Sequence, residues 1–171
     1  MLRKAGRDDL PYIAGIYERI HDAEERERQI GWLRGIYPTE ETARQAIDRG
    51  DMYLFVEEDR IVACAVINRI QVDVYAQCDW KYEASDDEVS VMHTLTVDPP
   101  EKGRGIGKRF VAEWEKLARD DGSTVLRLDA NSINTPARNL YKKCGFTEVG
   151  TVPCVFNGIP GINLVCMEKK L

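Results

Sequence analysis

The stretch Lys102-Gly103-Arg104-Gly105-Ile106-Gly107 decides how this chain folds, because it joins an apolar strand to an amphipathic helix. Glycines at every second position let successive backbone N–H groups converge, and a ligand can approach the main chain closely. The helix that begins here offers free N–H groups and the positive end of its dipole, and both favour an anion. The turn therefore predicts a site for a phosphate or pyrophosphate group.

Two other phosphate-binding motifs do not fit this spacing. A dinucleotide fingerprint, G-x-G-x-x-G counted from Gly103 and Gly105, would need glycine where Lys108 stands. A Walker loop would need its first glycine at Lys102 and a Ser or Thr after Gly107-Lys108. A glycine-rich strand-to-helix connection with solvated cations would give the same pattern, so the turn alone leaves both interpretations open.

Hydrophobic periodicity and turn residues divide the rest of the chain into helices and strands. Strands are expected over residues 1–5, Met52–Glu57, Ile61–Ile70, Val89–Val97, Val125–Asp129, Phe146–Val149 and Ile162–Glu168. Helices are expected from Asp8 or Asp9 to about His21, from the N-cap Thr39 to Gly50, from the glycine turn to about Asp120, and over Thr135–Cys144. Glu24 to Gln29 is interpreted as a solvated helix face, and Asn157 to Gly161 as a turn. The order β-α-α-β-β-β-α-β-α-β-β predicts an α/β (α+β) fold, with a mixed, mostly antiparallel central sheet flanked by helices.

The composition is that of a globular chain with one basic spot. Hydrophobic residues make up 43% and charged residues 31% of the chain, and no stretch approaches the roughly 20 apolar residues that span a membrane. The net charge of −5 argues against nucleic acid as a partner. Four cations nevertheless follow one another from Lys102 to Arg109 with no acid between them, which indicates a local anion site. No repeat or linker interrupts the chain, so residues 1–171 are interpreted as a single domain.

The cysteines and histidines argue against a metal site and against a disulfide framework. The five cysteines are odd in number, widely spaced and without a Cys-x-x-Cys pair, and the only histidines are His21 and His93. Met1 to Leu10 carries mixed charges and lacks the apolar core of a secretory signal. We therefore expect no metal, no membrane partner and a cytoplasmic location.

A second segment, Asn134-Thr-Pro-Ala137-Arg-Asn-Leu140-Tyr141-Lys-Lys-Cys-Gly145-Phe146, follows the glycine turn further along the chain. Together with the turn and the strand end Leu95-Thr96-Val97-Asp98-Pro99, it resembles the cofactor-binding signature of the GNAT superfamily of N-acetyltransferases. The resemblance is close over residues 88–150, and in the N-terminal half it extends only to the pattern of elements. Lys102 departs from it, because the family usually has Gln or Arg there. Lysine keeps the charge and lacks the forked donor geometry.

The resemblance implies acetyl-CoA as the cofactor and assigns residues to its parts. The pantetheine arm would pair with the strand end, the turn would hold the pyrophosphate, Asn134 would bond the pantetheine or phosphate region, and the last helix would line the channel. The implied cofactor-binding residues are Leu95, Thr96, Val97, Lys102, Gly103, Arg104, Gly105, Ile106, Gly107, Lys108, Asn134, Ala137, Leu140 and Tyr141. Core packing alone would also explain the apolar face that Ala137 and Leu140 share.

The implied reaction is direct transfer of the acetyl group to a primary amine of a small molecule or a peptide. A neutral amine attacks the thioester, an N–H near Leu95 stabilises the oxyanion, and Tyr141 matches the position of the family's acid. The base is ambiguous. Glu88, at the start of the central strand, resembles the location that many relatives use. Glu88 ranks slightly above His93. A histidine titrates in the right range for a base, but His93 lies on the same side of the predicted strand as apolar residues, as a packed core residue would.

Residues outside the motifs are candidates for the amine pocket. The aromatic candidates are Trp32, Tyr37, Tyr75, Trp80, Tyr82 and Phe156, and the acidic ones are Asp86, Asp87, Glu88 and Asp129. Two alternatives remain open. One is an enzyme of the same fold that transfers a longer acyl group, and the other is an acyl-CoA-binding sensor without turnover. The sequence names neither the amine nor the oligomeric state, and it leaves room for a homodimer.

Overall fold

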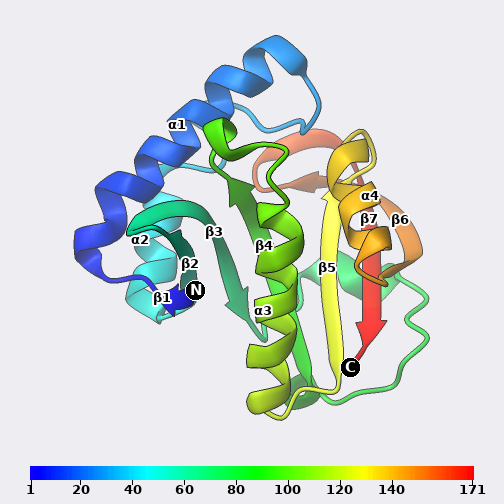
Figure 1. The fold of residues 1–171 in the computed structure, drawn as a ribbon. Helices are drawn as coiled ribbons and strands as arrows, with labels where there is room; N and C mark the ends of the chain where they lie inside the picture. Colours follow the sequence, from blue (N-terminus) through cyan, green and yellow to red (C-terminus); the bar gives the residue numbers. More distant parts are fainter.

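The computed structural model describes residues 1–171 and contains one seven-stranded sheet in the order β1-β2-β3-β4-β5-β7-β6 (Figure 1). The strands are β1 (Leu2–Lys4), β2 (Met52–Glu57), β3 (Arg60–Asn68), β4 (Val89–Val97), β5 (Val125–Asn131), β6 (Thr147–Phe156) and β7 (Ile159–Lys170). The helices are α1 (Leu10–Glu27), α2 (Glu40–Arg49), α3 (Ile106–Asp120) and α4 (Thr135–Lys143). Only β4 and β5 pair in parallel. The predicted order of elements and the mixed, mostly antiparallel sheet are confirmed.

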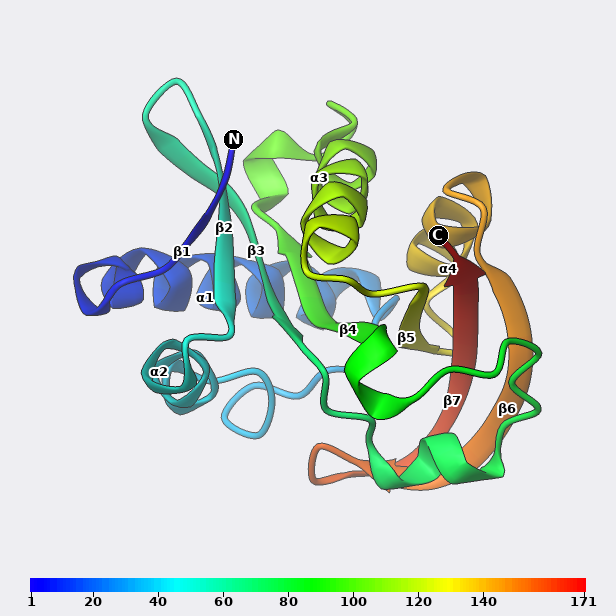
Figure 2. The same cartoon turned by 90° about the horizontal axis from the view of Figure 1, so that it is seen from below.

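The helices cover both faces of the sheet, with α3 and α4 on one face and α1 and α2 on the other (Figure 2). The apolar stripe of α3, including Phe110 and Trp114, is fully buried in the larger core beneath it. Helices α1 and α2 cover a smaller core around Ile13 and Tyr17. Apolar residues at helical spacing account for both contacts, because that spacing places them on one side of each helix.

Strands β4 and β5 separate along their length and leave a V-shaped opening in the sheet (Figure 1). Their pairing runs from Val89–Val125 to Met92–Leu128 and stops there. A register shift between β3 and β4 follows at once, and Thr94 within it has a φ of 54°. Such an angle is uncommon for a β-branched residue, so β4 carries a β-bulge here. Beyond Met92, the edge of β4 that faces β5 has no strand partner.

Helix α1 is longer than predicted, and Glu24 near its end is buried instead of exposed. The helix continues past His21 to Glu27, and Glu24 is only 8% exposed instead of lying on a solvated face. Its carboxylate accepts hydrogen bonds from the backbone N–H groups of Gln29, Ile30 and Gly31, at 2.7–3.0 Å. Backbone donors beyond the helix stabilise this buried charge, and sequence periodicity does not reveal them.

The hairpin of β6 and β7 is also longer than predicted. The strands predicted over Phe146–Val149 and Ile162–Glu168 extend to Phe156 and begin at Ile159, so only Asn157 and Gly158 form the turn. Both turn residues have positive φ angles, 50° and 77°, as a tight two-residue hairpin turn requires. Pro153 does not interrupt the hairpin, because β6 is an edge strand and needs no donor on its outer side.

Candidate active site

A cleft of about 1180 Å³ opens where β4 and β5 diverge. The predicted cofactor-binding residues that line it are Leu95, Thr96, Val97, Lys102, Gly103, Gly105, Ile106, Gly107, Lys108, Asn134, Ala137, Leu140 and Tyr141. Arg104 lies outside the cleft lining, and its guanidinium pairs with Glu101. The fold thus brings the strand end, the glycine turn and α4 to one cleft, although they are separate in the sequence.

The glycine turn presents backbone N–H groups to this cleft. Gly103 and Gly105 have φ angles of 84° and 73°, which L side chains rarely adopt, and a Cβ at either position would meet no atom within 4 Å. The N–H groups of both glycines and of Ile106 to Lys108 donate no hydrogen bond within the chain. They lie at the positive end of the α3 dipole, so the turn suits an anion such as a pyrophosphate.

Acids neutralise three of the four cations from Lys102 to Arg109, and one of these pairs joins Arg109 to Glu57. The ammonium nitrogen of Lys102 lies 2.9 Å from Glu27 at the end of α1, and Arg104 pairs with Glu101. Lys108, in the first turn of α3, has no acidic partner and lines the cleft. Lys108 is therefore the cation whose charge is available to a bound anion.

Tyr141 and Asn134 occupy the side of the cleft formed by α4. The Tyr141 ring is 6% exposed, and its hydroxyl makes no hydrogen bond within the protein. Burial raises the pKa of Tyr141 well above its ordinary value, and the nearby Asp129 carboxylate adds to this, so the hydroxyl keeps its proton. Asn134 caps α4 by accepting from the Ala137 N–H at 3.2 Å, which leaves its amide NH₂ free to donate.

The two predicted bases do not have the properties that a base requires. Glu88 lies outside the cleft lining, in a 3₁₀ turn before β4, where the Ser85 N–H and hydroxyl donate to its carboxylate at 3.0 and 2.7 Å. These bonds lower the pKa of Glu88. His93 lines the cleft 3.2 Å from Asn68 Oδ1, but burial lowers its pKa to about 4. The geometry therefore does not support Glu88, and His93 is a weak proton acceptor.

Asp129 is the acid of the cleft lining that neither a cation nor a backbone N–H group occupies, and the sequence indicated it only as one of several acidic candidates. It lies on β5 just beyond the last residue paired with β4. The Tyr75 hydroxyl donates to its Oδ2 at 2.7 Å, and no Lys or Arg side chain pairs with it. Burial raises the pKa of Asp129 to about 6, and the Tyr75 bond opposes part of that rise. An acid within the strand segment Leu128–Ala130, between two apolar residues, was the available sequence signal.

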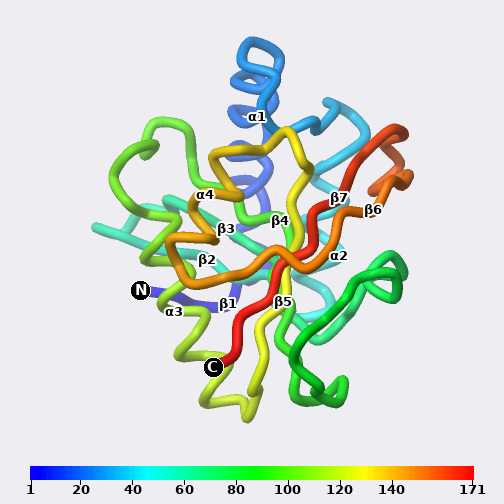
Figure 3. Tube along the Cα trace, turned by 90° about the vertical axis from the view of Figure 1, so that its right-hand side faces the viewer, coloured from blue at the N-terminus to red at the C-terminus, as the bar shows by residue number.

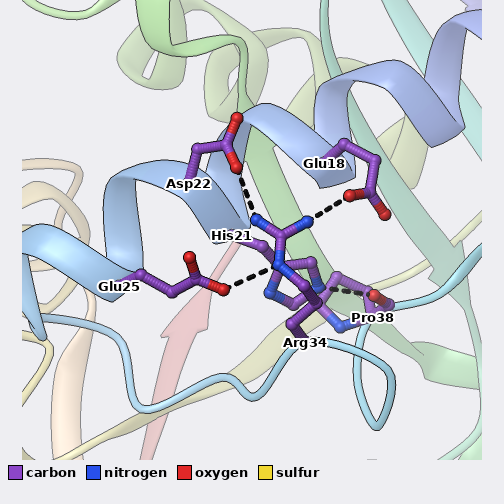
Figure 4. A network of polar contacts seen from close by, with 6 residues as sticks. All are labelled: Glu18, His21, Asp22, Glu25, Arg34 and Pro38. Carbon is purple, nitrogen blue, oxygen red and sulfur yellow. Dashed lines mark hydrogen bonds and ion pairs between the residues drawn. The ribbon is translucent and has the colours of Figure 1, made fainter.

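Residues 28–39, called the strap here, form one wall of the cleft and are fastened to α1 (Figure 4). The guanidinium of Arg34 pairs with three acids on one face of α1, namely Glu18, Asp22 and Glu25. A buried bond of 2.8 Å joins His21 Nε2 to the Pro38 carbonyl oxygen. Figure 3 shows the strap beside the β6–β7 hairpin, and a Cβ at Gly158 would lie 3.3 Å from the Ile36 side chain.

The aromatic candidates divide between the cleft and the core. Trp32 and Tyr37 of the strap and Phe156 of the hairpin line the cleft, with the Trp32 and Tyr37 ring centroids 6.0 Å apart. The Tyr37 hydroxyl is hydrogen-bonded to Thr94 Oγ1 in the β4 bulge. Tyr75 acts on the cleft through Asp129. Trp80 lies over the Arg127 guanidinium, 4.2 Å from its carbon, and neither Trp80 nor Tyr82 reaches the cleft.

Solved structures share this fold along nearly their whole length. A ribosomal-protein-alanine N-acetyltransferase from Brucella melitensis has a TM-score of 0.72 at 23% identity and covers 100% of this chain and 99% of its own. A structure from Salmonella typhimurium, described with its cofactor acetyl-CoA, has a TM-score of 0.69 at 20% identity and covers 100% and 93%. These likenesses establish an acetyltransferase-type fold.

Sequence comparison establishes the family. The sequence pattern of the acetyltransferase (GNAT) family matches residues 17–146, so the chain belongs to that family. An uncharacterised N-acetyltransferase of Methanocaldococcus jannaschii is 30% identical over 92 residues, which are 54% of this chain and 41% of that protein. The chain thus matches less than half the length of this curated relative. No helix is long and apolar enough to cross a membrane, and no group of three His, Cys, Asp or Glu side chains is arranged to hold a metal ion.

Proposed function

We propose that residues 1–171 act as a single N-acetyltransferase domain, which transfers the acetyl group of acetyl-CoA to a primary amine of a small molecule or a peptide. One observation carries the proposal: a single cleft joins a glycine turn with free N–H groups to a half-buried carboxylate that has no cation partner. The turn suits a pyrophosphate, and the carboxylate suits an ammonium group. Membership of the GNAT family supports the same conclusion.

The residues that would hold acetyl-CoA follow from the cleft. The free N–H groups of Gly103, Gly105 and Ile106 to Lys108 would bind the pyrophosphate, with the Lys108 ammonium beside them. The unpaired edge of β4 from Leu95 to Val97 would pair with the pantetheine arm. The Asn134 amide would donate to the same arm, and Ala137 and Leu140 would line its channel. Lys102 and Arg104 would contribute less, because acids already pair with them.

The protein's own groups would move two protons. Acetyl-CoA supplies the acetyl group as a thioester, whose carbonyl carbon the neutral amine attacks. The Asp129 carboxylate takes a proton from the substrate ammonium and later releases it to water. A backbone N–H of the unpaired β4 edge near Leu95 stabilises the negative charge on the carbonyl oxygen. As the C–N bond forms and the C–S bond breaks, the Tyr141 hydroxyl protonates the thiolate and regains a proton from the amine nitrogen.

Tyr141→Phe tests the proton donor. The substitution removes one hydroxyl and leaves the ring against Phe146, so the core should stay packed. Acetyl-CoA affinity is expected to stay unchanged, while turnover should fall by roughly 10²-fold, the loss expected for a positioned acid. Titration of the cofactor and a turnover assay on one preparation measure both. Near-normal turnover with intact affinity would show that the thiolate leaves unassisted.

A sensor without turnover would need no base, so the presence of a candidate base, Asp129, favours an enzyme. Acetyl-CoA consumption across a panel of amines separates the two functions, because a sensor binds the cofactor and consumes none. The same assay with longer acyl-CoA thioesters measures the acyl-chain preference.

Location and assembly complete the proposal. Five free cysteines fit a reducing compartment, so we place the protein in the cytoplasm.

A homodimer would use the exposed edge strand β6, where Val155 is 68% exposed. Light scattering of the wild type and of Val155→Lys measures this directly, since a dimer through β6 should dissociate in the variant.

A further inference from the structure

Resting on the proposed function, we propose that the amine substrate carries a single positive charge and an aromatic-sized apolar group near its amino nitrogen. Aralkylamines and peptides with an aromatic first residue share this chemistry. Polyamines and amino sugars, which carry several ammonium groups, do not. The inference follows from the amine half of the cleft, which we define as the part lined by the strap, residues 70–72 and the β6–β7 hairpin.

The amine half offers one negative charge. The residues that line it are Gln29, Ile30, Gly31, Trp32, Tyr37, Ile70, Val72, Phe156, Asn157, Ile159, Ile162 and Leu164, and none of them is charged. Asp129, at the inner end, is therefore the one acid that this half presents. A second ammonium group would lose its water against an apolar wall without gaining a partner, which is strongly unfavourable.

The other charged residues that border the cleft cannot receive a second ammonium group. The Glu24 carboxylate is occupied by backbone N–H groups, and Glu27 pairs with Lys102 beside the glycine turn. Glu101 pairs with Arg60 and Arg104. Arg26 and Arg49 are cations and would repel an ammonium group. Charge thus limits the substrate to one ammonium on this side.

The wall beside Asp129 is aromatic and apolar. Tyr37 and Asp129 line the same cleft. Burial raises the pKa of Tyr37 to about 12, and the Asp129 carboxylate adds to that rise. The Trp32 ring meets Tyr37 in a T-shaped contact at 6.0 Å. Both pack against Ile159 and Ile162 of the hairpin, in an apolar cluster separate from the main cores. A flat apolar group attached near the ammonium would lie against these rings.

The wall is held in place before any ligand arrives. Three backbone N–H groups of the strap are bound to Glu24, and Arg34 and Pro38 fasten the strap to α1. A wall fixed in this way loses little conformational freedom when a substrate binds, so it favours substrates that match its shape.

An amine panel tests the substrate class. With saturating acetyl-CoA, kcat/KM should be about 100-fold higher for phenethylamine than for spermidine, within the range that apolar pockets provide. Comparing kcat/KM for a peptide that begins with Phe with kcat/KM for phenethylamine shows whether the substrate is a peptide or a small molecule. Calorimetry with CoA present should give the same ranking of amine affinities without turnover. If acetylation proceeds but spermidine is preferred, this inference is wrong and the proposed function stands. If no amine is acetylated, the proposed function itself fails.

Three variants test the wall directly. Trp32→Ala should raise KM for phenethylamine about tenfold or more, with kcat and acetyl-CoA affinity unchanged. Leu33→Ala is the matched control, because Leu33 is the next residue of the strap, is 45% exposed and does not line the cleft. Phe156→Glu adds a second acid and should improve kcat/KM for cadaverine relative to phenethylamine about tenfold. Retained acetyl-CoA affinity shows that each variant is folded. Equal KM values for Trp32→Ala and Leu33→Ala would overturn the inference.

Discussion

Gly105→Glu is expected to lower the affinity for acetyl-CoA by about 100-fold or more, equivalent to about 3 kcal/mol. The new side chain would enter open space in the cleft, because no atom lies within 4 Å of the position of its Cβ. Its carboxylate would then lie where the free N–H groups of the turn receive a phosphate. Like charge at short range in a partly enclosed site accounts for a loss of this size. Calorimetry with acetyl-CoA measures it.

Gly122→Glu is the matched control for this experiment. Gly122 follows the other end of α3, has a φ of 78° against 73° for Gly105, and also has open space around its Cβ. Both substitutions therefore impose the same backbone strain, about 1–2 kcal/mol for a left-handed residue, and should lower the melting temperature similarly. Only the variant in the turn should lose acetyl-CoA. An equal loss of affinity in the two variants would mean that strain, and not the anion site, is responsible.

Asp129→Asn is expected to lower turnover by roughly 10²- to 10⁴-fold at neutral pH, the range for losing a general base. The amide is nearly the same size and can still accept the Tyr75 hydroxyl, so the cleft should keep its shape. In the wild type, kcat/KM should fall as the pH drops below about 6, because the carboxylate with a pKa of about 6 becomes protonated. The variant should lack this acidic limb.

The same substitution is expected to stabilise the fold at neutral pH. Burial raises the pKa of Asp129 from 3.8 to about 6, so the folded protein holds this proton more tightly than the unfolded chain does. Ionising the carboxyl costs stability as the pH rises through this interval, and the full cost is present above pH 6. Asp129→Asn removes a cost of about 1–3 kcal/mol. Its melting temperature should therefore exceed that of the wild type at pH 8, and the gain should vanish near pH 4.

Glu88→Gln serves as the control for Asp129, because its carboxylate lies outside the cleft. It should keep the turnover and the pH profile of the wild type, with a small loss of stability from the weakened Ser85 contacts. If Glu88→Gln removes the acidic limb and Asp129→Asn does not, the assignment of the base is wrong.

Local signals in the sequence were sufficient for the order of the helices and strands. The cap of α2 at Thr39 and its end at Gly50 lie as predicted, because side-chain capping and a left-handed glycine are local properties. The extent of the β6–β7 hairpin was not predictable in the same way. Pro153 and Gly161 interrupt strands in most contexts, and only the edge position of β6 makes the proline harmless.

The surroundings of Glu24 and Asp129 depend on contacts between distant segments, which sequence reasoning does not reveal. Glu24 resembles its exposed neighbours in sequence, and it is buried because the strap folds back over the end of α1. Asp129 differs from Glu88 through its surroundings: Tyr75, 54 residues earlier, lies against it, and the divergence of β4 and β5 opens the cleft beside it. The sequence offers Glu88 and Asp129 as equivalent acidic candidates, and only their three-dimensional surroundings distinguish one from the other.

The hydrogen bond between the Tyr37 hydroxyl and Thr94 Oγ1 joins the two halves of the cleft, and we expect it to couple them energetically. Tyr37 belongs to the wall that would meet the amine, and Thr94 to the bulge beside the edge that would meet acetyl-CoA. We expect a ligand that shifts one of these residues to shift the other. Thermodynamic linkage requires the amine to change the affinity for CoA by the same factor by which CoA changes the affinity for the amine, typically about 5- to 150-fold in coupled sites. Tyr37→Phe should bring that cooperativity factor close to one.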